Sequence, residues 1–324
     1  LVAGSVSLAR KFKVSDFVIG AAIVGVGTSM PEFVVSFLGA INGNADVAIG
    51  NVVGSNIFNV LGILGLTAIF FPVAIDRKNM KFEIPLCIAV SVVLTALALN
   101  FFNGSPASIS RLDGMLLLVF FAGFMWYSFA RDRKQAAQNA EVAEEKSPIW
   151  LALVKILGGL ALLITSCDFF VDNAVLVAKS FGVNDAFISL TLIACGTSLP
   201  ELAASIAAAV KKNTDMALGN IVGSNIFNIT LILGLSSQVM PLTSSGITYI
   251  DYLVMIGAAV FPLLLGLRGK VGRFGGLVML LWKNHWGVIK AGIAASAGAL
   301  AYAAMYLAKT YWWSGIFKHG LTPE

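Results

Sequence analysis

Two glutamates, Glu32 and Glu201, stand in the same unusual setting, each directly after a proline and within a long apolar stretch. Residues 27–32 read Gly-Thr-Ser-Met-Pro-Glu, and residues 196–201 read Gly-Thr-Ser-Leu-Pro-Glu. An ionised carboxylate is costly to keep in hydrocarbon, so such groups usually serve a function. A carboxylate duplicated in this way predicts a cation site. The structural alternative is that each glutamate is protonated or hydrogen-bonded to a neighbouring helix.

A second repeated segment supplies neutral oxygen atoms. Residues 50–59 read Gly-Asn-Val-Val-Gly-Ser-Asn-Ile-Phe-Asn, and residues 219–228 read Gly-Asn-Ile-Val-Gly-Ser-Asn-Ile-Phe-Asn. In each copy a serine and the last asparagine lie four residues apart, which places them on one face of a helix. The glycines let helices approach closely, and this small-residue spacing alone indicates only helix packing.

Oxygen ligands of these kinds suit hard cations. Calcium takes about six to eight oxygen ligands, often including carboxylates and backbone carbonyls, and two glutamates would balance its charge. A proline cannot donate a hydrogen bond to the carbonyl four residues earlier, so each Pro-Glu pair also frees a backbone oxygen. The neutral serine and asparagine oxygens suit sodium.

Composition predicts an all-α integral membrane protein. Hydrophobic residues make up 58% of the 324 residues, charged residues make up 12%, and the mean hydropathy is +0.86. The apolar residues are gathered in runs that are long enough to cross the hydrocarbon of a membrane as helices. Eight are found, at 17–41, 47–71, 84–102, 112–130, 149–167, 186–210, 216–240 and 248–267.

The scarcity of histidine and cysteine argues against enzyme and cofactor chemistry. The chain has two histidines, both near its C-terminal end, and three cysteines, all inside apolar runs. We therefore expect no zinc or copper centre, no histidine-based hydrolase and no bound cofactor.

Basic residues gather on alternate connections between the apolar runs, as the positive-inside rule predicts for cytoplasmic loops. The net charge of +5 therefore indicates orientation in a membrane rather than nucleic-acid binding. The polar stretch 131–148 lies on this basic side and is predicted to be a cytoplasmic linker. We expect a multi-pass protein of a plasma or inner membrane, surrounded by lipid and without an obligate protein partner.

Both motifs recur at an offset of 169 residues, which indicates an internal duplication. Five predicted crossings separate the run holding Glu32 from the run holding Glu201, so the two copies run in opposite directions. Inverted repeats are a common plan of secondary transporters. Because the run 149–167 has no counterpart ahead of residue 1, we also expect a truncated first helix. The predicted organisation is a first half at 1–130, the linker at 131–148, a second half at 149–270 and an irregular segment with a possible last helix at 271–324.

Together the paired motifs resemble the two alpha repeats of the sodium/calcium exchangers, in the prokaryotic-type branch of the calcium/cation antiporter superfamily. The resemblance implies two inverted halves of about five transmembrane helices each, and exchange of cytoplasmic calcium for external sodium. It implies a Ca²⁺ site made of Thr28, Glu32, Thr197 and Glu201. It also implies neighbouring Na⁺ sites made of Ser29, Ser55, Asn59, Ser198, Ser224 and Asn228.

One departure from the family pattern is Asn228, where some relatives carry aspartate. The predicted core charge is therefore −2, and both the number of sodium ions per calcium and any potassium co-transport stay open. Two other functions also stay open. A proton/calcium antiporter would let the same glutamates accept protons, and a cation channel would place acidic side chains in a pore.

Overall fold

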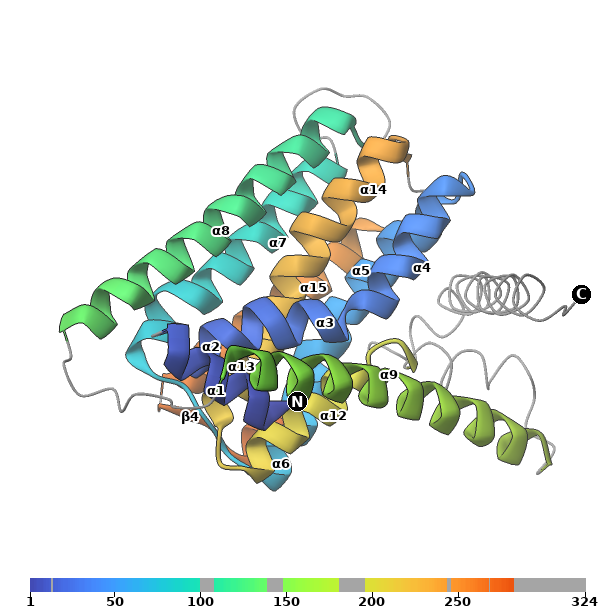
Figure 1. Cartoon of the computed structure of the whole chain (residues 1–324). Helices are drawn as coiled ribbons and strands as arrows, with labels where there is room; N and C mark the ends of the chain where they lie inside the picture. The colour runs from blue at the N-terminus through green and yellow to red at the C-terminus, as the bar shows by residue number, and fades with distance from the viewer. Residues whose placement is uncertain are drawn as a thin grey trace, which may run out of the picture.

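The computed structural model describes residues 1–12, 14–99, 108–138, 148–180, 196–243, 246–267 and 269–282. Almost all of these residues are helical, as Figure 1 shows. The all-α class predicted from composition is therefore confirmed.

The first half of the chain is built from long helical runs, some of which contain π-helical segments (η). Its described elements are α1 (Val2–Phe12), α2 (Asp16–Ile19), η1 (Gly20–Gly25), α3 (Val26–Thr28), α4 (Met30–Ile41), α5 (Ala45–Ile57), η2 (Phe58–Leu64), α6 (Gly65–Phe70), β1 (Val73–Ala74), η3 (Asn79–Glu83), α7 (Ile84–Ala98), β2 (Ser108–Ile109) and α8 (Arg111–Gln138).

The second half repeats much of this order. Its described elements are α9 (Ile149–Ser180), α12 (Leu199–Val210), α13 (Thr214–Phe227), η5 (Asn228–Ile232), α14 (Leu233–Val239), β3 (Leu242–Thr243), α15 (Tyr249–Gly266) and β4 (Lys270–Val271), followed by a helix at Arg273–Trp282.

Most of the apolar runs predicted from the sequence are helices that can span a membrane. Within the described residues, six helical runs are long and apolar enough, and the bent pair Asp16–Thr28 and Met30–Ile41 makes a seventh. These seven match seven of the eight predicted runs. The eighth, 186–210, is described only from residue 196, where α12 follows.

The predicted linker and tail are described only in part. Residues 131–138 continue α8, and residues 139–147 lie outside the described residues. At the C-terminal end, the helix Arg273–Trp282 is described, and the remainder of the segment 271–324 lies outside the described residues.

The offset of 169 residues relates elements as well as motifs. It carries the start of α4 onto the start of α12, and the strand β1 onto β3. Each short strand then pairs antiparallel with a strand of the other half. Val73 lies opposite Val271 in the β1–β4 pair, and Ile109 lies opposite Leu242 in the β2–β3 pair. The two inverted halves are therefore joined at two separate places.

The helices that carry the second motif lie at the centre of the bundle. In an apolar stretch of 18 residues within each span, 94% of the residues are buried in Thr214–Val239 and 78% in Ala45–Phe70, against 22% in Arg111–Arg131. Close packing here depends on glycine. A Cβ atom on Gly219 would collide with the backbone of Phe17, and one on Gly223 would collide with Ala21, so α13 can lie directly against α2 and η1.

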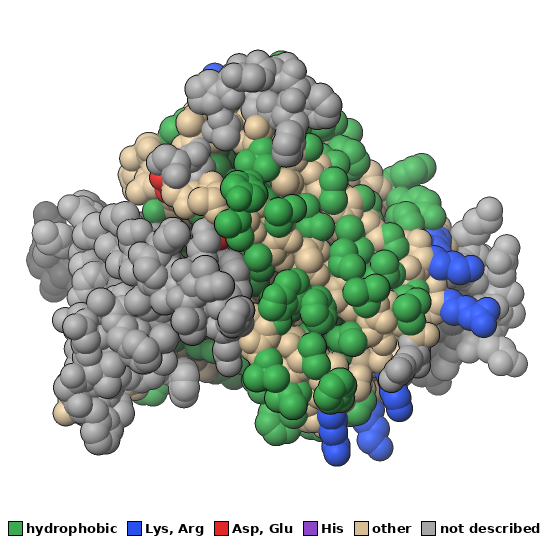
Figure 2. Space-filling view, turned by 180° about the vertical axis from the view of Figure 1, so that it is seen from behind, with side chains coloured by type: hydrophobic (Ala, Val, Ile, Leu, Met, Phe, Trp, Pro, Cys, Tyr) green, Lys and Arg blue, Asp and Glu red, His purple; other side chains and the backbone are tan. Residues whose placement is uncertain are grey.

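The outer helices present apolar side chains. Exposed large side chains on α8 include Leu112, Val119 and Trp126, and those on α9 include Leu157 and Leu162. Figure 2 shows hydrophobic side chains spread over the middle of one face, with Lys and Arg at its margins. Such a surface is what a multi-pass membrane protein presents to lipid.

Candidate cation site

The first glutamate motif forms a break between two helices. The helix α3 ends at Thr28 and α4 begins at Met30, with a bend of 51° between the two runs. Pro31 lies at the start of α4, where its missing N–H costs nothing because the first helical N–H groups have no partner. In the second copy, Pro200 likewise lies at the start of α12.

This break places each glutamate in the first turn of a helix. Glu32 is in the first turn of α4 and Glu201 is in the first turn of α12. The N-terminal end of a helix carries a partial positive charge, which favours a carboxylate there. Both side chains are fully buried, with no exposed area. The two carboxylates therefore face the protein interior rather than lipid.

Each carboxylate is held by a serine of the other repeat. The Ser29 hydroxyl donates to Glu201 Oε1 at 2.7 Å, and the Ser198 hydroxyl donates to Glu32 Oε1 at 2.8 Å. The two bonds are related by the duplication. They bring the two Pro-Glu motifs to one place at the interface of the repeats. Thr197 and Thr28 also lie beside Glu32 and Glu201 respectively.

The serines of the second motif are placed less symmetrically. Ser55 Oγ lies 3.4 Å from Ser198 Oγ, so it joins the cluster around Glu32. The Ser224 hydroxyl instead donates to the backbone oxygen of Gly25 at 3.3 Å. The predicted sodium ligands are thus all in the core, but no described hydrogen bond joins Ser224 to a carboxylate.

The last asparagine of each motif lies in a π-helical segment. Asn59 belongs to η2 and Asn228 begins η5. Short π-helical segments within α-helices often mark functional sites. Both asparagines are fully buried, η2 packs against α12, and η5 packs against α4. Each predicted amide ligand therefore lies on an element that contacts the glutamate helix of the other repeat.

Another repeated asparagine supports the glutamate helices, and sequence reasoning assigned it no role. Asn51 Nδ2 donates to the backbone oxygen of Glu32 at 3.0 Å and to Ser36 Oγ at 2.9 Å. Its counterpart Asn220 donates to the backbone oxygen of Glu201 at 3.1 Å and to Ser205 Oγ at 2.9 Å. The recurrence of this asparagine in both motifs was the available signal.

The core holds several buried oxygen atoms that accept no hydrogen bond. Those in the repeated motifs are Glu32 Oε2, Glu201 Oε2, Asn59 Oδ1 and Asn228 Oδ1, and others lie outside the motifs, such as Asn79 Oδ1. Buried polar atoms are normally satisfied, and an exception calls for an explanation. Among the described contacts, no Lys, Arg or His reaches either carboxylate. Two carboxylates with neutral oxygens, and without a neighbouring base, form a donor set that fits a hard cation.

The donor set does not fit a transition-metal centre. Among the described residues, no three His, Cys, Asp or Glu side chains come together as metal ligands. The site relies on carboxylate, hydroxyl and amide oxygens, which hard ions such as calcium prefer over zinc or copper.

Comparison with known proteins agrees with this geometry. The model of the family described as sodium/calcium exchanger protein matches residues 1–130 and 151–282. The chain belongs to the sodium/calcium exchanger family. Each half of this family member carries one of the matched segments, which is consistent with the duplicated fold.

Relatives and a solved structure cover nearly the whole chain. The putative antiporter CaxA of Alkalimonas amylolytica is 39% identical, over 86% of this chain and 89% of its own length. The sodium/calcium exchanger MaX1 of Methanosarcina acetivorans is 31% identical, over 85% and 89%. A structure of the sodium-calcium exchanger NCX_Mj, soaked with zero Na⁺ and Ca²⁺, superposes with a TM-score of 0.74 at 31% identity, over 86% and 89%.

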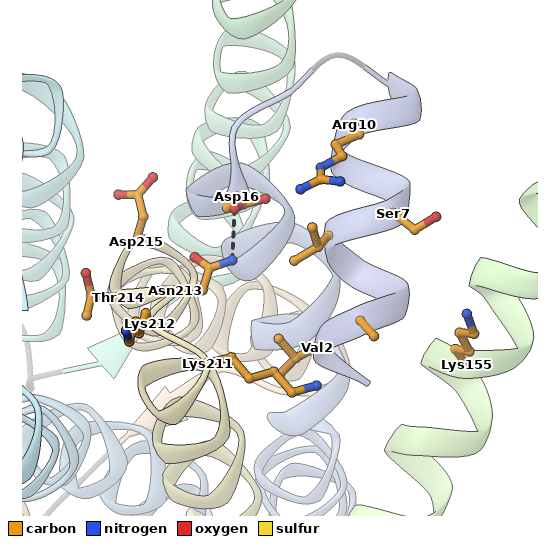
Figure 3. Close-up of a pocket in the computed structure, with 12 residues that line it drawn as sticks. Val2, Ser7, Arg10, Asp16, Lys155, Lys211, Lys212, Asn213, Thr214 and Asp215 are labelled. Carbon is orange, nitrogen blue, oxygen red and sulfur yellow. Dashed lines mark hydrogen bonds between the residues drawn. The ribbon is translucent and has the colours of Figure 1, made fainter. Parts of the chain in front are cut away.

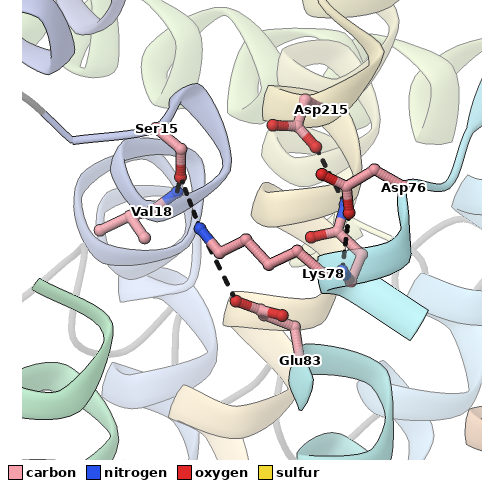
Figure 4. A network of polar contacts seen from close by, with 7 residues as sticks. Ser15, Val18, Asp76, Lys78, Glu83 and Asp215 are labelled. Atoms are coloured by element: carbon pink, nitrogen blue, oxygen red, sulfur yellow. Dashed lines mark hydrogen bonds and ion pairs between the residues drawn. The ribbon is translucent and has the colours of Figure 1, made fainter. Parts of the chain in front are cut away.

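Away from the cation site, this family member has a second polar cluster, which we call the Lys78 cluster (Figure 4). Lys78 Nζ donates to Ser15 Oγ at 3.3 Å and lies 3.9 Å from Glu83 Oε1. Asn79 Nδ2 donates to Asp215 Oδ1 at 2.9 Å. The cluster joins the start of α2, the start of η3 and the first turn of α13, and it includes its own cationic side chain.

A cavity of about 590 Å³ lies beside α1, α9 and the turn between α12 and α13 (Figure 3). Its lining includes four basic side chains, Arg10, Lys155, Lys211 and Lys212, and two acidic ones, Asp16 and Asp215. Neither site glutamate lines it. Because its basic side chains outnumber its acidic ones, this cavity suits Ca²⁺ less well than the buried oxygen cluster does.

Proposed function

We propose that this chain is a secondary antiporter that exchanges Na⁺ for Ca²⁺ across a membrane. The observation that carries the proposal is the pair Glu32 and Glu201. The two buried carboxylates come from opposite repeats, each is held by a serine of the other repeat, and each keeps one oxygen without a hydrogen bond. Relatives named as a sodium/calcium exchanger and a putative antiporter support it.

The charges of the site suit competition between the two ions. Two ionised glutamates balance one Ca²⁺, whose ligands would be Thr28, Glu32, Thr197 and Glu201. Sodium ions would share the same carboxylates and add neutral oxygens from Ser29, Ser55, Asn59, Ser198, Ser224 and Asn228. If three Na⁺ exchange for one Ca²⁺, each cycle moves one charge, worth about 2.3 kcal/mol per 100 mV. If two exchange, the membrane potential has little effect.

Exchange requires that the site open to one side at a time. Inverted repeats provide two related arrangements of the same elements, and alternation between them is the usual mechanism of such folds. Ions bias the change only through different affinities for the different states. Without a cation, two ionised carboxylates brought together repel one another. An empty site should therefore resist closure, which prevents uncoupled leak.

The test is isotopic calcium uptake into liposomes that contain the purified protein, with gradients of sodium, potassium and pH imposed separately. We expect uptake that follows an outward sodium gradient at fixed pH. The blank is the Glu32→Gln/Glu201→Gln double variant, which keeps the shape of both side chains. A matched control is Asp113→Asn, which alters a carboxylate at the start of α8, far along the chain from either motif.

Each remaining outcome selects a different function. Uptake that ignores sodium and follows a pH gradient identifies a proton/calcium antiporter. Calcium flux that needs no counter-ion identifies a channel. Failure of the potassium gradient to change uptake in the presence of sodium excludes potassium co-transport.

A further inference from the structure

A reciprocal set of amide hydrogen bonds lies where α5 meets α13. Asn56 Nδ2 donates to the backbone oxygen of Asn225 at 3.1 Å, and Asn225 Nδ2 donates to the backbone oxygen of Asn56 at 3.1 Å. Asn59 Nδ2 donates to Asn225 Oδ1 at 3.0 Å, and Asn228 Nδ2 donates to Asn56 Oδ1 at 3.1 Å. Every one of these bonds crosses between the repeats. We refer to these four residues as the amide clasp.

We propose that Asn56 and Asn225 are positioning residues, which orient the amides of Asn228 and Asn59 so that their carbonyl oxygens are available to cations. The proposal deepens the proposed function, because it rests on the same cation site. It assigns a role to two repeated residues that supply no predicted ligand of their own.

The backbone acceptors determine which end of each side-chain amide, the oxygen or the NH₂ group, faces which partner. A backbone carbonyl accepts hydrogen bonds and cannot donate them, so the amide face that Asn56 presents to the Asn225 backbone must be its NH₂ group. The oxygen of Asn56 then faces Asn228, and Asn228 has to present its own NH₂ group there. Its carbonyl oxygen is thereby turned away from the clasp. In the same way, Asn225 presents its NH₂ group to the Asn56 backbone and its oxygen to Asn59, so that Asn59 presents its own NH₂ group to Asn225.

Burial makes this orientation consequential. Asn56 and Asn225 are each 2% exposed, whereas Asn59 and Asn228 have no exposed area. Asn59 Oδ1 and Asn228 Oδ1 accept no hydrogen bond. Leaving a buried acceptor without a hydrogen bond is unfavourable in free energy. The clasp leaves two such acceptors, one on Asn59 and one on Asn228. A bound cation would satisfy both acceptors.

The position of Asn59 on its helix indicates that its side chain lies on the side of the carboxylate cluster. Ser55 precedes it by four residues, which is about one helical turn. Ser55 Oγ lies 3.4 Å from Ser198 Oγ, and Ser198 donates to Glu32. The helix face that carries Asn59 is therefore the face that meets the carboxylate cluster.

The alternative is a purely structural role, in which the hydrogen bonds of the clasp only hold α5 against α13. The two roles differ in what rescues a lost clasp residue. Asn56→Ala removes the acceptor that holds Asn228, so the Asn228 amide is free to turn its NH₂ group towards the site. Aspartate has acceptor oxygens on both sides of its side chain, so Asn228→Asp should make this turn harmless. A fastening role offers no reason for rescue at that position.

The experiment compares single and double variants in the liposome assay and in a thermal-shift assay of Na⁺ and Ca²⁺ binding to the purified protein. Because a lost ligand interaction with an ion is worth a large factor in affinity, we expect Asn56→Ala to raise the apparent KM for sodium about tenfold. In the Asn228→Asp background, Asn56→Ala should raise the apparent KM for sodium less than about twofold.

Rescue should be specific to the partner. Asn228→Asp should rescue Asn56→Ala and leave Asn225→Ala impaired, whereas Asn59→Asp should rescue Asn225→Ala and leave Asn56→Ala impaired. Asn79→Ala is the matched control, because it removes a buried asparagine of the Lys78 cluster and should combine additively with Asn228→Asp. If Asn56→Ala does not fold, Asn56→Leu provides the same test, because leucine is similar in size to asparagine and has no acceptor oxygen.

Equal losses in both backgrounds, or rescue by either aspartate, would overturn the proposal. So would unchanged ion affinity in both alanine variants. The thermal-shift assay separates this failure from that of the proposed function. A wild-type protein that binds both ions and does not exchange them contradicts the antiporter, while the crossed rescue of ion binding still decides the role of the clasp.

Discussion

The cation site and the Lys78 cluster are both buried groups of acidic and amide side chains, yet they differ in how their charge is compensated. Around Glu83 the chain supplies Lys78, a cation of its own. Around Glu32 and Glu201 the described hydrogen bonds come only from neutral hydroxyl groups. A buried charge needs a partner. The Lys78 cluster contains that partner, and for the Glu32 and Glu201 carboxylates we propose that a cation from solution takes its place.

The two regions also differ in symmetry. The hydrogen bonds of Ser29 and Ser198 to the two carboxylates of the cation site form a pair related by the duplication. The contact of Asp215 has a partial counterpart, because Gly246 N donates to Asp46 Oδ1 at 2.9 Å, but the lysine is not duplicated, since Ile247 stands at the position related to Lys78. A site that must be reached from both sides of a membrane benefits from inverted symmetry. A structural contact has no such requirement.

The largest expected effect comes from removing one carboxylate of the cation site. Glu32→Gln or Glu201→Gln should each lower sodium-driven calcium uptake by about 100-fold or more, because a charged ligand is replaced by a neutral one. The measurement is initial uptake rate at matched protein density. Asp215→Asn, in the other cluster, should retain a rate close to wild type. A Gln variant with a normal rate would remove the distinction between the two regions.

The close packing of the central helices should also respond strongly to a substitution, here through the stability of the fold. Gly223→Ala places a Cβ atom against Ala21, so we expect a loss of about 1–3 kcal/mol in stability, as in other overpacked cores. Gly123→Ala on the outer helix α8 is the control, because a Cβ there meets no described atom within 4 Å. Thermal unfolding of the two purified variants checks the difference. Similar melting temperatures would contradict it.

Removal of a serine should have an intermediate effect on ion affinity. Ser29→Ala and Ser198→Ala each take one hydrogen bond from a carboxylate and one oxygen from the site. We expect the apparent KM for sodium to rise roughly tenfold, since hydrogen bonds to charged groups are worth about 1.5–3 kcal/mol. The duplication predicts similar values for both variants. A large effect from only one of them would show that the two halves of the site are not equivalent.

The smallest effect on transport should come from the Lys78 cluster. Lys78→Met removes the cation beside Glu83, and we expect about 1–2 kcal/mol less stability from its lost polar contacts. The apparent KM values for sodium and calcium should change less than about twofold, which is under 0.5 kcal/mol. Thermal unfolding and uptake are measured on the same preparation. A strong change in ion affinity would mean that this cluster belongs to the transport pathway.

Much of the fold and the two site glutamates could be predicted from this sequence, because polar residues stand out in the apolar segments of a membrane protein. The duplicated Pro-Glu motif identified Glu32 and Glu201, and the structure brings both into one buried cluster. Seven of the eight predicted apolar runs are confirmed as candidate spans among the described residues. The ligand roles of Thr28, Asn59 and the other predicted ligands remain predictions.

The amino-acid sequence by itself determined the membrane class, the duplication, the opposed direction of the repeats and the side chains that carry charge in the core. Only the tertiary structure decided that Ser29 serves Glu201 rather than Glu32, and that Asn56 and Asn225 meet across the repeats. The physical reason is that helical periodicity assigns residues to a face but does not say which other face it meets. The orientation of an amide depends on that partner.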